Sequence, residues 1–339
     1  MTLSMGVGLF PTEPVPRMRE LVLQAEQLGY ANAWVGDSQN IWRDATVTLG
    51  AASVGTSRII LGTGVTNPVT RHPSVQASTW ASLHEATAGR VAMGVGVGDS
   101  ALFTMGLKPA RLQELESTIT DLRSLWAGRE VTEGATGTGY RLAYLDEPSP
   151  VPVYIAATGP KILQLAGRVA DGVILLAGTS SAFVEAGLRM IEKGAAEAGR
   201  TLDDLHIVLW TPTAIDPDPV AARDLVRAHV ARVAMRPLPV AVGPAEAAAI
   251  ERIRAAYDYY EHMEVGAAHS ALVPDSLVDL FALAGTPDEC AARLTELDHL
   301  GVDQVAIVPY VAPGADRADT LSAFAEIVSG ERPRRRGNR

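Results

Sequence analysis

Short runs of β-forming residues alternate with longer amphipathic segments along almost the whole chain. Each run is followed by a segment in which apolar residues recur at helical spacing. Parallel strands need long crossovers, usually helices, and eight strand–helix units close into a barrel. The sequence therefore predicts an α/β fold, a (β/α)8 TIM barrel. The predicted strands are residues 5–10, 31–35, 58–61, 91–96, 153–156, 172–176, 205–211 and 304–308.

A doubly wound open sheet is the main alternative to a barrel. Its dinucleotide-binding members carry Gly-x-Gly-x-x-Gly at the turn after the first strand. No such turn follows residues 5–10. The glycine-rich run from Gly94 to Gly98 stops short of the motif, and no helix pattern starts directly after it. The strand count and the missing turn both favour the barrel.

Two segments depart from the alternation. Residues 130–147 hold several glycines and no clear period, which predicts a loop or a small hairpin. After the seventh strand, about residues 212–284 form an alanine-rich insertion of mainly helical character. We therefore predict one domain over residues 1–330 that includes this insertion. Basic residues 331–339 are predicted to form a disordered tail.

Composition excludes several classes of protein. The chain has 339 residues, 47% hydrophobic and 20% charged, which is enough apolar material for a large core. A net charge of −10 argues against nucleic acid as a partner. Cys290 is the single cysteine, so an internal disulfide and cysteine-based metal clusters are excluded. Without a signal-peptide pattern or an apolar run long enough to cross a bilayer, we expect a cytoplasmic protein with no membrane partner.

The active site of such a barrel lies at the C-terminal ends of the strands. Those ends hold few acids and bases: the carboxylates are Glu13, Asp37 and Asp99, and His72 is the nearest histidine. No metal-ligand spacing and no Gly-x-Ser-x-Gly turn occurs there, so no metal site is predicted. Glycine, threonine and alanine dominate instead. This pattern indicates a cofactor that brings its own reactivity to a small-molecule substrate.

One loop concentrates the polar groups of this predicted site. Residues 61–73 read LGTGVTNPVTRHP, in which Gly62 and Gly64 flank Thr63 just beyond the third strand. Glycines at such a place let the backbone come very close to a flat ligand. The alternative is an ordinary loop whose glycines serve only its turn.

Two later strand ends predict phosphate binding. Residues 157–159 precede a helix pattern that starts at Pro160, and residues 177–179 precede the next helix. Small residues there leave backbone N–H groups free at a helix N-terminus, which binds phosphate. Ordinary N-capping by Thr158 and Ser181 is the alternative for each segment alone.

With these motifs the chain resembles the luciferase-like flavin and deazaflavin oxidoreductases. It is most similar to the coenzyme F420-dependent methylenetetrahydromethanopterin reductases, over nearly the whole chain. The most specific parts are residues 61–73, 94–99, 159–160 and 278–289. The resemblance implies a barrel with an insertion after strand seven and coenzyme F420, or alternatively FMN, at the strand ends.

The resemblance also implies roles for individual residues. A non-prolyl cis peptide at Gly64-Val65 would lie against the ring face, so that no side chain at Gly64 would fit beside the ring. Asp37 would lie near the ring, and Asp37 and Glu13 are the candidate proton donors. The cofactor-binding residues that we expect are Asp37, Thr63, Gly64, Val65, Thr66, Gly96, Val97, Gly98, Asp99, Ala157, Thr158, Gly159, Ala177, Gly178 and Thr179.

Two positions depart from the relatives. Ser38 stands where many relatives carry a histidine. Gly8 stands where the methanopterin reductases carry a glutamate in the first strand. The resemblance therefore predicts the fold and the class of cofactor, but not the substrate of those reductases.

We expect an F420-dependent oxidoreductase that transfers a hydride between the deazaflavin and a small organic substrate. An FMN-dependent monooxygenase and a cofactor-binding barrel without catalysis are the alternatives. Family members dimerise through early helices, so a homodimer is expected through residues 74–85, which include Trp80. The rings of the insertion form either a substrate lid or ordinary helix packing: Tyr257, Tyr259, Tyr260, His262 and His269.

Overall fold

Eight parallel strands form the centre of the protein in its computed structural model, which describes residues 3–133 and 137–330. These strands are β1 (Ser4–Leu9), β2 (Asn32–Val35), β3 (Ile60–Thr63), β4 (Val91–Val95), β7 (Val153–Ala157), β8 (Gly172–Leu175), β9 (His206–Ile215) and β11 (Gln304–Pro309). They pair in the order β1, β2, β3, β4, β7, β8, β9 and β11, and β11 pairs with β1 to close the ring. The predicted (β/α)8 barrel is confirmed.

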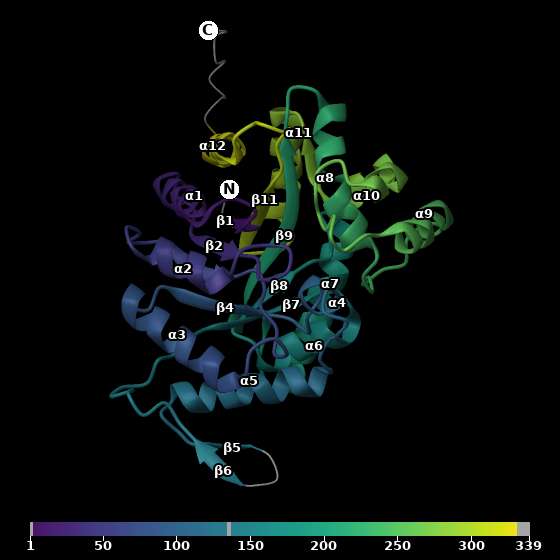
Figure 1. Ribbon diagram of the computed structural model, residues 1–339. Helices are drawn as coiled ribbons and strands as arrows, with labels where there is room; N and C mark the ends of the chain where they lie inside the picture. Colours follow the sequence, from purple (N-terminus) through teal and green to yellow (C-terminus); the bar gives the residue numbers. More distant parts are fainter. Residues whose placement is uncertain (1–2, 134–136, 331–339) are drawn as a thin grey trace.

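Helices surround the barrel, as Figure 1 shows. The first of them buries Met18, Leu21, Val22 and Ala25 completely, because these residues recur at helical spacing on the face toward the strands. The helices are α1 (Val15–Gln27), α2 (Ala45–Ser53), α3 (Pro73–Thr87), α4 (Ser100–Phe103), α5 (Leu112–Trp126), α6 (Pro160–Val169), α7 (Ser181–Glu197), α8 (Pro219–Ala234), α9 (Pro244–Ala256), α10 (Asp275–Phe281), α11 (Pro287–Asp298) and α12 (Arg317–Ser329), with short 3-10 helices η1 (Leu202–Asp204) and η2 (Ala268–Leu272).

The start of β3 differs from the prediction. The strand begins at Ile60 instead of residue 58, because the chain just before it wraps around the carboxylate of Glu26 on α1. The backbone N–H groups of Arg58 and Ile59 donate to Glu26 Oε2 at 2.7 and 2.8 Å, and that of Ser57 donates at 2.9 Å. These donors hold the pKa of Glu26 at about 2, although burial opposes its ionisation.

The insertion is helical, as predicted, but it starts later. β9 continues to Ile215 instead of ending at residue 211, because Thr213–Ile215 pair with a further short strand, β10 (Leu283–Gly285). Helices α8, α9 and α10 lie between these two strands in the sequence. The predicted hairpin at residues 130–147 is also confirmed, since β5 (Val131–Glu133) and β6 (Thr138–Tyr140) pair antiparallel and project from the barrel in Figure 1.

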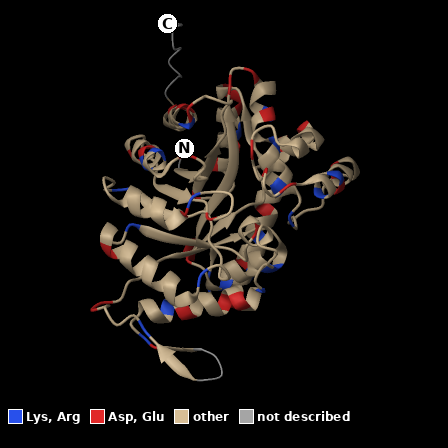
Figure 2. Cartoon of the chain, in the orientation of Figure 1, with Lys and Arg blue, Asp and Glu red and all other residues tan. Residues whose placement is uncertain are grey.

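Charged residues of both signs lie mainly on the helices and loops around the barrel, as Figure 2 shows. No helix within residues 3–133 and 137–330 is both long and apolar enough to span a membrane.

Trp80 is 2% exposed, so it packs inside the protein and does not offer the dimer contact that the sequence suggested. The predicted basic tail, residues 331–339, lies outside the described residues.

Candidate functional site

A cavity of about 630 Å³ opens at the C-terminal ends of the barrel strands. A volume of this size suits a cofactor or a drug-sized ligand. Loops after several strands and parts of the insertion supply its walls. The predicted site residues that line it are Asp37, Gly64, Val65, Thr66, Gly96, Val97, Gly98, Asp99, Thr158 and Gly159.

Backbone forms one wall of this cavity. Thr66 N donates to Gly94 O at 2.9 Å, and Gly96 N donates to Thr66 O at 2.9 Å, so the loop after β3 runs beside the end of β4. The Gly64-Val65 peptide bond in this loop is cis, as the resemblance implies. Because glycines make up much of this wall, a flat ligand can approach the backbone closely.

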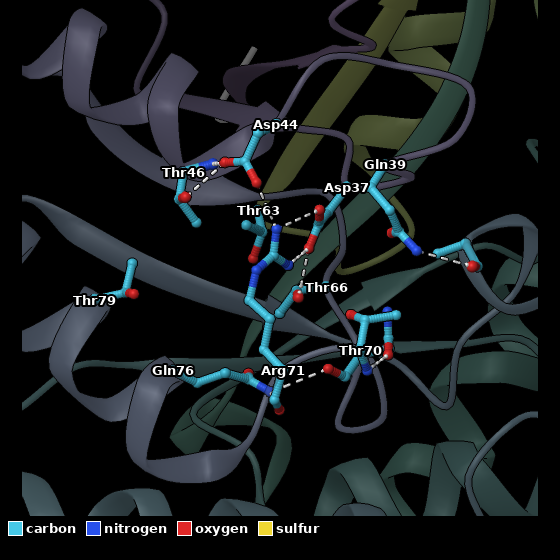
Figure 3. A network of polar contacts seen from close by, with 12 residues as sticks. Asp37, Gln39, Asp44, Thr46, Thr63, Thr66, Thr70, Arg71, Gln76 and Thr79 are labelled. Carbon is cyan, nitrogen blue, oxygen red and sulfur yellow. Dashed lines mark hydrogen bonds and ion pairs between the residues drawn. The ribbon is translucent and has the colours of Figure 1, made fainter. Parts of the chain in front are cut away.

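Asp37 follows β2 and is held from two sides. Its side chain is 1% exposed and forms an ion pair with Arg71, which is 19% exposed. Thr66 Oγ1 donates to Asp37 Oδ2 at 2.7 Å, and Arg71 Nη2 donates to Oδ1 at 3.2 Å. The guanidinium also donates to Asp44 Oδ2 at 2.8 Å, and Figure 3 shows it between the two carboxylates. A carboxylate bound in this way is an acceptor that anchors the loop, which does not favour the predicted role as a proton donor.

Glu13 lies outside the set of described residues that line the cavity. Its side chain is 35% exposed, and its carboxylate lies 2.7 Å from Arg317 Nη2 and 3.5 Å from Arg17 Nε. These ion pairs hold Glu13 outside the cavity wall, and its role as a proton donor stays a prediction. Glu13 follows a strand, as site residues do, so its local sequence suggested a site residue. Its partner Arg317 lies about 300 residues later, so the sequence around Glu13 does not reveal the pair.

Asp99 joins the loop after β4 to the insertion. Its two carboxylate oxygens lie 2.6 Å from Arg232 Nη2 and 2.6 Å from Arg236 Nη2. Burial alone would raise the pKa of Asp99, but the charges of Arg236 and Arg232 lower it below its ordinary value. Asp99 is therefore an ionised anchor that holds the end of α8 over the cavity.

The first predicted phosphate site faces the cavity. Helix α6 begins at Pro160 after Gly159, and no side chain caps its first turn. Thr158, Gly159 and Lys161 line the cavity. Since no side chain among the described residues caps α6, its first N–H groups and Lys161 are available to a ligand in the cavity.

The second predicted phosphate site is filled by the insertion. The N–H groups of Thr179 and Ser180 both donate to Leu280 O, at 2.9 and 3.2 Å, and Thr179 Oγ1 donates to Ala282 O at 3.1 Å. Gly178 has φ +86°, and a Cβ there would lie 2.5 Å from Leu280 O. This segment docks the end of α10, and its contact with a phosphate stays a prediction that these hydrogen bonds do not support.

Three other predicted residues are buried in the barrel. Thr63 and Ala157 are each 1% exposed, and Ala177 is 0% exposed. Thr63 Oγ1 donates to Gly94 O at 2.6 Å. None of the three belongs to the described residues that line the cavity. They are packed in the barrel next to the residues that do line it.

Trp210 of β9 lines the cavity, although the sequence assigned it no role. A Cβ at Gly8 would lie 2.4 Å from Trp210 Cη2, and a Cβ at Gly64 would lie 2.7 Å from the same atom. The indole therefore fills space that both glycines leave open. An added side chain at Gly64 would also lie 3.0 Å from Trp34 Cβ, so it would meet both tryptophans whether or not a ring is bound.

Other aromatic rings extend this surface. Phe10 stacks on Trp42 with ring centroids 4.3 Å apart and planes at 9°. His229 of α8 lies 5.7 Å from the Phe10 ring, and His262 lies 5.7 Å from the Trp42 ring. All four side chains line the cavity. The sequence marked His262 as a possible lid residue but missed His229, which lies within an otherwise ordinary helix pattern.

Comparison with known proteins matches residues 3–304 to a family described as luciferase-like monooxygenase. The 5,10-methylenetetrahydromethanopterin reductase of Methanolobus tindarius is 34% identical over 329 residues, covering 94% of this chain and 98% of that protein. An F420-dependent glucose-6-phosphate dehydrogenase of Beutenbergia cavernae is 32% identical over 320 residues, with 90% and 89% covered.

The fold has a close structural neighbour. The solved structure of a coenzyme F420 dependent tetrahydromethanopterin reductase from Methanopyrus kandleri superposes with a TM-score of 0.78 at 27% sequence identity. The superposition covers 97% of this chain and 99% of that chain. The similarity thus spans the barrel and its insertion.

Proposed function

Because this chain belongs to the luciferase-like monooxygenase family, we propose that it is an oxidoreductase that depends on coenzyme F420. Relatives that are 34% and 32% identical carry the names of a methylenetetrahydromethanopterin reductase and an F420-dependent glucose-6-phosphate dehydrogenase. The observation that carries the proposal is the backbone wall of Gly64, Val65 and Gly96, on which a flat ring system fits.

The described residues fit such a cofactor. The ring would rest on the backbone wall, and its phosphate would lie at the uncapped N-terminus of α6 beside Lys161. Both features belong to one cavity of about 630 Å³. Reduced F420 supplies a hydride, so the protein needs no metal for this chemistry.

The chain's own residues orient the ligands and exclude water. Asp37, held by Arg71 and Thr66, fixes the loop that forms the wall. Asp99 fixes α8 over the cavity through Arg232 and Arg236. Both carboxylates are paired with arginines, which does not favour proton transfer by either of them. Their contribution is to orient the loop and the helix that form the cavity.

The substrate is proposed to differ from methylenetetrahydromethanopterin. By the resemblance, Gly8 stands where the methanopterin reductases carry a glutamate, and a Cβ at Gly8 would lie 2.4 Å from the Trp210 indole. An apolar ring therefore lies beside this position. This favours a substrate with an apolar body.

We propose a homodimer in which a second copy covers α2 and α3. Val47 and Val54 at α2 are 59% and 68% exposed, and Val75 on α3 is 52% exposed. Exposed apolar side chains on neighbouring helices are typical of subunit contacts. Light scattering at micromolar concentration should give the mass of a dimer, and a monomer would contradict this proposal.

A substitution in the wall tests the cofactor proposal. A Cβ at Gly96 would lie 3.3 Å from Val65 Cγ2, so Gly96→Ala should fold. The larger side chain of Gly96→Val should occupy the space in front of the backbone wall. We expect Gly96→Val to weaken F420 binding by at least about tenfold, which corresponds to about 1.4 kcal/mol. Gly50→Val is the matched control, because its Cβ would meet nothing within 4 Å.

Unchanged F420 affinity in Gly96→Val would refute the placement of the ring. Consumption of reduced F420 with a carbonyl, imine or alcohol substrate separates an enzyme from a barrel that only carries the cofactor. Absence of turnover with normal F420 binding would favour the carrier.

A further inference from the structure

Two histidines of the insertion line the cavity, and each has one ring nitrogen bonded to a tyrosine. His229 Nδ1 lies 3.1 Å from the Tyr310 hydroxyl, and His262 Nδ1 lies 2.7 Å from the Tyr257 hydroxyl. His229 is 1% exposed and His262 is 4% exposed. Among the described residues no partner contacts either Nε2 atom, so Nε2 is the nitrogen left to face a bound molecule.

The tyrosines determine which nitrogen carries the hydrogen. Burial raises the pKa of Tyr310 and of Tyr257 above the usual range, so both hydroxyls keep their protons. We take each hydroxyl as the donor to the imidazole nitrogen beside it, an assignment that ¹⁵N spectra of the histidines test. An imidazole that accepts at Nδ1 carries its own hydrogen on Nε2 when it is neutral.

Both imidazoles are neutral near pH 7. Burial lowers the pKa of His262 to about 3, although the charge of Asp99 opposes this shift. Burial, together with the charges of Arg236 and Arg232, holds the pKa of His229 well below its ordinary value. The two rings therefore offer uncharged N–H donors.

The surroundings of these donors favour a ligand with an apolar body. Asp99 lies 2.6 Å from both Arg232 and Arg236 and balances one of their two positive charges. The aromatic surface of Phe10 and Trp42 lies beside the two imidazoles. A ligand in this corner therefore needs an apolar body and one hydrogen-bond acceptor.

We infer that the Nε2–H groups of His229 and His262 bind the oxygen of a carbonyl substrate. The inference rests on the proposed function, because a carbonyl carbon accepts the hydride that reduced F420 supplies. Hydride from the reduced cofactor would form a C–H bond at the carbonyl carbon, the two neutral imidazole donors would stabilise the negative charge that grows on the oxygen, and a proton from solvent would complete the alcohol. Tyr310 and Tyr257 are positioning residues that keep each ring in the donor tautomer.

The test uses the full chain labelled with ¹⁵N at histidine, with and without F420. Cyclohexanone is the probe, and methylenecyclohexane is the matched compound that lacks the oxygen. The ¹⁵N spectra should show His229 and His262 as neutral Nε2–H tautomers. Cyclohexanone should shift the Nε2 signals of both rings, whereas methylenecyclohexane should not.

Variants give an independent readout. His229→Phe and His262→Phe should each weaken cyclohexanone binding about three- to tenfold, as expected for one lost hydrogen bond, and leave F420 affinity unchanged. Tyr310→Phe should keep the fold and convert the His229 signal to a mixture of tautomers. His299→Gln is the matched control, because His299 is exposed at the end of α11.

The two proposals fail in different ways. Failure of F420 to bind the wild-type protein would overturn the proposed function. If F420 binds normally but cyclohexanone shifts the ¹⁵N signal of neither imidazole, this inference alone is overturned. Full cyclohexanone affinity in His229→Phe and His262→Phe would also overturn it.

Discussion

Removing Arg71 should destabilise the protein through the carboxylate that it leaves behind. The substitution Arg71→Met keeps the length of the side chain and removes the charge. Asp37, at 1% exposure, would then be an unpaired charge that water cannot reach. Breaking a buried pair costs about 3–5 kcal/mol. Because Arg71 itself is 19% exposed, we expect the lower end of that range, about 3 kcal/mol.

Thermal unfolding and urea unfolding measure this change. A loss of about 3 kcal/mol corresponds to a fall in Tm of about 4 °C for a chain of this size. F420 affinity should fall as well, because the loop that Asp37 anchors carries Thr66 and the backbone wall. The double variant Asp37→Leu with Arg71→Met should recover much of the stability, since no unpaired charge remains.

Exposed Arg129 provides the control, and Arg129→Met should change the Tm by less than about 1 °C. An unchanged Tm in Arg71→Met would refute the anchor role of the pair. If Asp37 were the proton donor instead, Asp37→Asn would abolish turnover while Tm and F420 affinity stayed normal.

Two further predictions concern the barrel. Glu26→Gln should lower the free energy of unfolding by about 2–3 kcal/mol at pH 7. The folded-state pKa of Glu26 is about 2, below its unfolded value. In urea unfolding curves wild type should therefore lose this advantage in stability as the pH falls from about 4.3 toward 2. An advantage that persists at pH 2 would contradict this prediction. Gly8→Ala should lower the Tm because its Cβ would lie 2.4 Å from Trp210 Cη2. Adding Trp210→Phe, which removes that atom, should restore part of the lost Tm. An equal Tm for Gly8→Ala and for the double variant would argue against the contact.

Local patterns were sufficient to predict the barrel. Strand and helix periodicity depends on neighbours in the chain, and all eight barrel strands were predicted from it. The end of β9 was missed because Pro212 locally argues against a strand, whereas the partner strand β10, about 70 residues later, supports Thr213–Ile215. Likewise, the start of β3 depends on Glu26, more than 30 residues earlier.

The site was predicted less completely than the fold, for the same physical reason. Residues 157–161 and 177–181 carry the same small-residue signal, but only tertiary structure reveals that Leu280 occupies the N–H groups of the second segment. Glu13 and Asp37 both follow strands, yet their arginine partners decide that one faces the surface and the other anchors the cavity wall. His229 had no local signal, since its neighbours form an ordinary helix.

A cavity that holds a deazaflavin should distinguish F420 from FMN in parallel titrations. The purified full chain is titrated with each cofactor while absorbance and fluorescence are recorded. We expect saturable binding of F420 and a much weaker response, or none, with FMN. Saturable binding of FMN with no response to F420 would contradict it.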